Sequence, residues 1–202
     1  MSVSGAVFDM VKLLDVSKNV ISKFTAEKIY DETLKWAKRY DKELETMLTE
    51  NKDYAMKILN IERGGNKPRK DISKWSEVKD SIIYMYDDKF ENNKTYEFQN
   101  ITDKEEIKDI LNSYLSKHFD INDNKQTWFD KIKDLSQEKG YAREVKEYKA
   151  NPEKYKGHVG DISTVIRVAL TGRHNTPDLY EIMQILGKNS ITNRISKICG
   201  GN

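Results

Sequence analysis

Arginine is the residue type whose placement in this chain most clearly indicates chemistry. The chain has 28 lysines but only seven arginines, and six of the seven fall in two segments, 61–75 and 139–202. Arginine forms paired hydrogen bonds to phosphates and to the edges of bases, whereas lysine acts as a single point charge. The uneven placement indicates a site that binds a polyanion, although chance scatter or structural ion pairs would also produce it. The six residues are Arg63, Arg69, Arg143, Arg167, Arg173 and Arg194.

The overall net charge of +2 conceals a segregation of charge along the chain. Segment 61–75 has five basic and two acidic residues, and segment 139–202 has eleven basic and six acidic residues. Between them, residues 76–138 have nine basic residues against fifteen acidic ones. Charge of one sign gathered in this way is typical of a polyanion-binding surface.

The run from Arg167 to Lys188 combines basic residues with a helix–turn–helix pattern. Gly172 ends the first helix, and the second is expected to begin at Thr176-Pro177, because proline is favoured at the first position of a helix. Unpaired N–H groups at such an end attract an anion or a base carbonyl. Arg167 and Arg173 flank the turn. An ordinary helical hairpin has the same pattern, so a structural interpretation stays open.

Other chemistries find little support. The three histidines are far apart and have no second ligand at a metal-binding spacing, so no metal site is expected. Neither a phosphate-binding glycine loop nor a nucleophile elbow is present. Cys199, the lone cysteine, is expected to serve packing. The carboxylates lie on polar helix faces, where a solvated surface is the simpler interpretation than an acid–base pair. We therefore expect no catalytic residue, no metal and no cofactor in this chain.

Composition favours an all-α protein. Hydrophobic residues make up 37% of the 202 residues and charged residues 34%, with only three prolines and ten glycines. No apolar run approaches the roughly 20 residues that span a bilayer. A single cysteine fits a reducing, cytoplasmic compartment. Helical spacing of apolar residues predicts helices over 26–48, 52–61, 73–86, 102–118, 126–138, 142–149, 161–170, 176–186 and 190–198, with a loop over 87–101.

Polar residues at the expected helix starts predict where the backbone N–H groups are capped. Thr25 is expected to cap the first long helix, and Asp71 or Ser73 the helix near residue 73. Thr102 to Glu105 has the pattern of a capping box. Asp161 is expected to cap the helix that carries Arg167.

Four stretches, in order along the chain, resemble the C-terminal part of bacterial-type glutamyl-tRNA synthetases. The most specific is Arg167 to Lys188, which reads RVALTGRHNTPDLYEIMQILGK. The others are GAVFDMVKL at 5–13, KPRKDISKW at 67–75 and YKGHVGD at 155–161. Both nucleotide-binding signatures of that enzyme class, His-Ile-Gly-His and Lys-Met-Ser-Lys-Ser, are absent. The resemblance thus implies a part of the enzyme that begins just after the catalytic half.

The resemblance implies an all-α, anticodon-binding region made of two packed helical subdomains. Residues 1–24 would be the remnant of the stem-contact or linker segment, 25–100 the first subdomain and 101–202 the second. The parent would be a class I glutamate–tRNA ligase that uses ATP and Mg²⁺, and this part would grip the anticodon arm of tRNA(Glu). Whether tRNA(Gln) is also a partner stays open. A cytoplasmic monomer with no membrane contact is expected.

The family's base-reading residues carry over onto Arg167, Thr176, Pro177 and Leu179. A further arginine of the first subdomain reads another base; it is matched to Arg69, with Arg63 as the rival. Weaker phosphate contacts are expected from Arg173, Lys156 and Lys188. The alternative is a helical scaffold for a protein partner, which predicts apolar surface patches and no RNA affinity.

Overall fold

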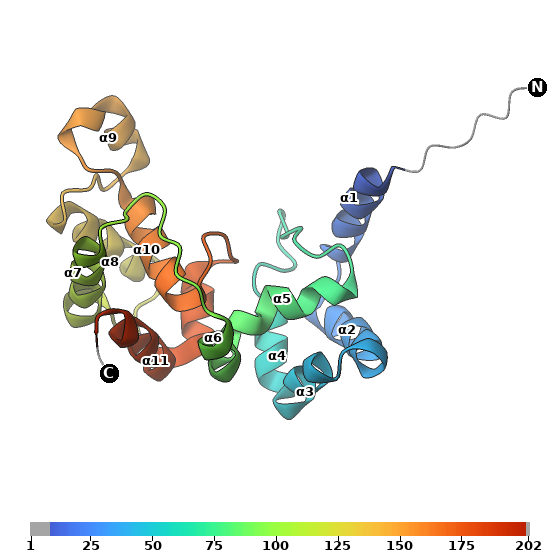
Figure 1. The fold of residues 1–202 in the computed structure, drawn as a ribbon. Coiled ribbons are helices and arrows are strands. Elements are labelled where there is room, and N and C mark those ends of the chain that lie inside the picture. The colour runs from blue at the N-terminus through green and yellow to red at the C-terminus, as the bar shows by residue number, and fades with distance from the viewer. Residues whose placement is uncertain (1–8, 201–202) are drawn as a thin grey trace, which may run out of the picture. The chain divides into compact units, whose positions relative to one another are not determined.

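The computed structural model describes residues 9–200, which divide into two compact units at Ile83 and Tyr84 (Figure 1). All the regular structure of these residues is helical, with eleven α-helices, so the predicted all-α class is confirmed. The only extended pairing within 9–200 is an isolated bridge between Ala142 and His158. No helix in the described range is long and apolar enough to cross a membrane. The first eight residues of the expected linker segment 1–24 lie outside the described residues.

The first unit contains α1 (Met10–Ile21), α2 (Ala26–Tyr40), α3 (Lys42–Glu50), α4 (Lys52–Leu59) and α5 (Val78–Ile82). Thr25 caps α2 as predicted, accepting a hydrogen bond from the backbone N–H of Lys28. Fully buried side chains of α2, α3, α4 and α5 form the core, because each helix has one apolar face. They are Ile29, Leu44, Leu48, Ala55 and Val78.

The single helix expected over 26–48 is wrong, because Asp41 interrupts it. The backbone of Asp41 is extended, and its carboxylate accepts the N–H of Leu44 at 3.0 Å, which caps the start of α3. The same carboxylate accepts two hydrogen bonds of 3.1 Å from the ammonium of Lys79. A cap residue that also pairs with a distant helix thus overrides a continuous helical pattern.

Neither Asp71 nor Ser73 caps the helix near residue 73. The chain there forms a 3₁₀ turn, η1 (Trp75–Glu77), and Lys74 at its N-cap has no side-chain hydrogen bond to it. Instead, the backbone N–H of Ser73 donates to the carboxylate of Glu77 at 2.7 Å. The Ser73 hydroxyl donates to the same carboxylate, so Glu77 ties the residue before the N-cap to the turn.

The second unit begins at Tyr84, so residues 84–100 belong with it and not with the first subdomain expected over 25–100. The expected loop over 87–101 is wrong in its first part, which forms α6 (Asp87–Asn93). Arg194 of α11 holds this segment in the second unit, because its guanidinium binds the Asp87 carboxylate and the Tyr84 carbonyl. The ring of Phe90, 2% exposed, lies 4.0 Å from that guanidinium.

The rest of the second unit consists of α7 (Lys104–Ser113), a π-helical turn η3 (Tyr114–His118), α8 (Lys125–Glu138), α9 (Val145–Ala150), a 3₁₀ turn η4 (Pro152–Lys154), α10 (Val159–Thr171) and α11 (Leu179–Ile198). Helix α10 packs against α7, α8 and α11. Gly187 has a non-helical backbone inside α11, so the expected break at this glycine is confirmed. Fully buried aliphatic side chains of this core include Ile110, Leu111, Ile132, Leu135, Ile162, Ile166, Leu170, Ile182, Ile191 and Ile195.

Two expected caps in this unit are displaced. Asp103, not Thr102, caps α7 by accepting the N–H of Glu106. His158 caps α10. Asp161, the third residue of this helix, completes a capping box by accepting the backbone N–H of His158 at 2.8 Å. Asp161 therefore stabilises the same helix start from inside the helix.

Candidate nucleic-acid interface

The structure brings Arg167, Thr176 and Pro177 together. Arg167 projects from the last turns of α10, and Gly172, with a positive φ of 67°, ends the helix and turns the chain back. Nη1 of Arg167 then donates to the carbonyl oxygen of Pro177 at 2.9 Å and to the hydroxyl of Thr176. The hydroxyl of Thr176 also donates to the Pro177 carbonyl at 2.9 Å. The turn between α10 and α11 therefore holds the guanidinium of Arg167 in place.

The expected helix start at Thr176-Pro177 is wrong by two residues. Helix α11 begins at Leu179, and Asp178 caps it by accepting the N–H of Glu181 at 3.0 Å. The Asp178 carboxylate also forms an ion pair of 2.8 Å with Lys125 of α8. The Asp178 carboxylate thus pairs with one of the free N–H groups at this helix start and places a negative charge beside the positive end of the helix dipole.

Thr176 and Leu179 are buried, at 6% and 3% exposed. The Thr176 hydroxyl serves Arg167 and the backbone, and the Leu179 side chain belongs mainly to the core of the second unit. Leu179 still borders an open cavity beside Arg167. With 3% of its surface exposed, Leu179 lines this cavity without protruding from the surface.

Beside Arg167 lies an open cavity of about 610 Å³ between α8, α10 and the start of α11. Ser163 and Arg167 are four residues apart on α10 and so lie on the same face of this helix. The cavity is lined by a mixture of polar, charged and aromatic groups. The lining residues are Lys125, Gln126, Trp128, Phe129, Ser163, Arg167, Asp178 and Leu179.

Side chains of α8 form one wall of this cavity, which the sequence did not predict. Phe129 is half-buried, and the ammonium of Lys133 lies 5.0 Å from the centroid of its ring. A hydrogen bond to Glu144 raises the pKa of Lys133, so this cation stays charged beside the aromatic ring. The sequence shows only the apolar spacing of α8. This spacing does not distinguish residues that face the core from residues that line a cavity. Trp128, 7% exposed, is mainly core, as its helical spacing predicted.

The turn between α10 and α11 contains two further groups. The guanidinium carbon of Arg173 lies 5.2 Å from the centroid of the Tyr84 ring, an attractive cation–aromatic contact. Both ring nitrogens of His174 are buried and have no hydrogen-bond partner among residues 9–200. Buried polar atoms are normally satisfied, so an unsatisfied imidazole in this turn is unusual. Nothing in the sequence pattern singled out His174.

The expected phosphate-binding lysines differ in their surroundings. The ammonium of Lys156 pairs with Glu106 at 2.8 Å, although 60% of its side chain is exposed. It also lies 5.9 Å from the ring of Tyr141, whose hydroxyl has a raised pKa, chiefly because of burial. Lys188 is exposed on α11.

Arg69 and Arg63 lie in the first unit, and acidic or carbonyl groups engage both. Nε of Arg69 donates to Asp71 at 2.6 Å, and its Nη1 lies 3.7 Å from Glu62. Nε of Arg63 donates to the carbonyl of Leu59 at 2.9 Å, and burial lowers its pKa. The geometry of the first unit does not favour one arginine over the other.

Residues 28–199 match the family model described as the anticodon binding domain, and the chain therefore belongs to this family. Several glutamate–tRNA ligases are similar to this chain. The chain is 48% identical over 198 residues to that of Acetivibrio thermocellus and 46% identical over 199 residues to that of Clostridium perfringens strain SM101. It is 22% identical over 199 residues to that of Bacillus subtilis. Each alignment covers 98% of this chain, which spans 36% of the length of these relatives.

Proposed function

We propose that this chain binds the anticodon arm of tRNA(Glu) as the RNA-recognising part of a glutamate–tRNA ligase. In this proposal the chain binds and positions the tRNA. ATP- and Mg²⁺-dependent glutamylation belongs to a catalytic part within the remaining length of the relatives. The protein acts as a cytoplasmic monomer.

The cavity beside Arg167 is the observation that carries the proposal. Proteins recognise single-stranded RNA loops by stacking unpaired bases on aromatic side chains and by hydrogen bonding to base edges. The cavity offers the ring of Phe129 as a wall and the guanidinium of Arg167, which the turn at Thr176-Pro177 holds in place. Because the turn fixes the arginine before RNA arrives, little side-chain entropy is lost on binding. The unsatisfied imidazole of His174 lies in the same turn.

Contacts outside the cavity complete the proposed interface. Arg69 or Arg63 reads a second anticodon base from the first unit. Arg173, Lys156 and Lys188 approach phosphates, which adds salt-sensitive affinity without sequence choice.

A titration of the chain with the tRNA(Glu) anticodon stem-loop at two salt concentrations tests the proposal. Arg167→Ala should weaken binding by about 1–3 kcal/mol, the cost of one lost base-reading contact. Arg143→Ala is the matched control, because Arg143 lies in the same unit but pairs with Asp134 on the surface. Its effect should be small and should depend on salt.

Altered loops complete the test. A loop with a changed anticodon should bind the wild-type protein as weakly as the original loop binds the Arg167→Ala variant. Binding that ignores both the anticodon and Arg167 would reduce the proposal to a generic basic surface. The tRNA(Gln) stem-loop, measured in parallel, decides whether this second tRNA is a partner.

A helical scaffold for a protein partner is the second candidate function. Helix α1 favours it, since five of its apolar side chains are between 46% and 70% exposed. They are Met10, Val11, Leu13, Val16 and Val20. This alternative predicts that no stem-loop binds at either salt concentration.

A further inference from the structure

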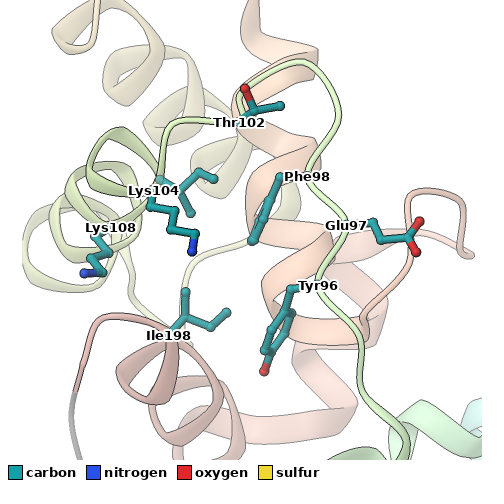
Figure 2. A pocket seen from close by; sticks show the side chains of 8 residues that line it. Tyr96, Glu97, Phe98, Thr102, Lys104, Lys108 and Ile198 are labelled. Carbon is teal, nitrogen blue, oxygen red and sulfur yellow. The ribbon is translucent and has the colours of Figure 1, made fainter.

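A second cavity, of about 500 Å³, lies in the second unit and shares no lining residue with the cavity beside Arg167 (Figure 2). Three separate parts of the chain form it: the segment between α6 and α7, helix α7, and the end of α11. Its volume lies within the range of about 300–1,000 Å³ that is usual for small-molecule sites. Its lining residues are Tyr96, Glu97, Phe98, Thr102, Lys104, Ile107, Lys108 and Ile198.

Apolar groups form most of the walls. The rings of Tyr96 and Phe98 are stacked, with centroids 6.3 Å apart and planes inclined by 19°. Ile107 and Ile198 face the cavity from two helices. Two aromatic rings and two branched aliphatic side chains suit a flat, apolar molecule, because such a body covers ring faces that are otherwise exposed to water.

Lys104 supplies the charge of this site. In Figure 2 its ammonium group points into the space between the ring of Phe98 and Ile198. Its neighbour on the next turn of α7, Lys108, points away from that space and pairs with Glu105 at 2.9 Å. No carboxylate among residues 9–200 lies within ion-pairing distance of Lys104. The carboxylate of Glu97 borders the same cavity but points away from Phe98 and Lys104.

We propose that this cavity binds a small organic carboxylate with a planar aromatic body. The body lies against Phe98 and Tyr96, and the carboxylate accepts a hydrogen bond from the ammonium of Lys104. An ammonium beside an apolar surface is only partly hydrated, so a charge-assisted hydrogen bond there gains more than one in open water. A neutral or cationic molecule of the same shape lacks this bond and binds more weakly.

The test is an NMR titration of the ¹⁵N-labelled chain with 2-naphthoate, and with 2-naphthylmethanol as the neutral probe of similar shape. Naphthoate should shift the backbone amides of Phe98, Lys104 and Ile198. It should bind about tenfold more tightly than the alcohol, the ratio expected for one charge-assisted hydrogen bond. Lys104→Met should bring this ratio to about one, whereas the matched control Lys108→Met should leave it near ten.

Three results would overturn the proposal: no shift of these amides at millimolar naphthoate, a preference for naphthoate that survives in Lys104→Met, or equal loss in both lysine variants. Competition separates this site from the anticodon interface. Saturating naphthoate should leave the affinity for the stem-loop unchanged, and displacement of the RNA would show that the cavity belongs to the RNA surface instead.

Discussion

Replacing Arg194 with methionine should destabilise the second unit by about 2–5 kcal/mol, because two buried backbone carbonyls lose their hydrogen-bond donor. Arg194 is 2% exposed, although it is one of the most polar side chains in the molecule. Its Nη1 donates to the carbonyl of Tyr84 at 2.8 Å and to the carbonyl of Leu170. Its Nε and Nη2 donate to Asp87 at 3.0 and 2.7 Å.

The magnitude follows from what methionine leaves unpaired. Each buried carbonyl that loses its donor costs about 1–3 kcal/mol, and the Tyr84 and Leu170 carbonyls both lose Arg194. Asp87 contributes little, because 58% of its side chain is exposed and water replaces the arginine there. Methionine retains an attractive contact with the ring of Phe90, which offsets a part of the loss.

Urea unfolding measures this effect as a lower midpoint with an unchanged slope. Arg143→Met is the matched control, because Arg143 pairs with Asp134 at a partly exposed site and should cost less than about 1 kcal/mol. If Arg194→Met also costs less than about 1 kcal/mol, the hydrogen bonds of Arg194 do not hold this unit together. A large loss would also weaken RNA binding in the proposed function, because Leu170 lies on the same helix as Arg167 and three residues after it.

Three further outcomes are expected. Gly172→Ala should lower the free energy of unfolding, measured in urea, by about 1–2 kcal/mol, because the position has a φ of 67° and an added Cβ would lie 3.0 Å from a backbone oxygen. The control Gly65→Ala, at a position with open space around it, should change this free energy by under about 0.5 kcal/mol. The Glu138 carboxylate should titrate near the low value of about 2 that hydrogen bonds from Lys117 and then His118 produce. The contribution of Glu138 to stability is then complete above its ordinary pKa of 4.5 and is lost as the pH falls toward 2, and an unchanged carboxyl titration by NMR in Lys117→Met would contradict this cause. Lys188→Ala should lower the slope of stem-loop affinity against salt by about one while leaving the anticodon preference intact, and a changed preference would contradict a phosphate contact.

Local rules in the sequence determined much of the fold. Apolar residues at helical spacing predicted an all-α chain and placed most of the helices, because the period of the pattern depends only on helix geometry. Thr25 and Gly172 marked helix ends through their own chemistry, a hydroxyl acceptor in one case and a tolerated positive φ in the other. The run from Arg167 to Lys188 also identified the family, since a long motif is specific without any coordinates.

Tertiary contacts decided what the local patterns left open. The helix expected over 26–48 breaks at Asp41, which is held by Lys79 from a helix far along the chain. Residues 87–93 form a helix despite their acidic, asparagine-rich composition, and the buried Arg194 binds its first residue. Neither outcome follows from propensity, because a hydrogen bond to a distant residue outweighs a preference of a few tenths of a kcal/mol per residue.

The sequence by itself placed Arg167, Thr176 and Pro177 around one turn, and the structure joins all three by hydrogen bonds. It did not reveal that Leu179 is buried, that Asp178 caps the following helix, or that Phe129 of α8 lines the adjoining cavity. Burial and cavity walls depend on which helix faces meet, and that is set by packing between segments far apart in the chain. Residue chemistry and spacing thus determined which groups are available, while the packing of α8, α10 and α11 decided which of them face one another.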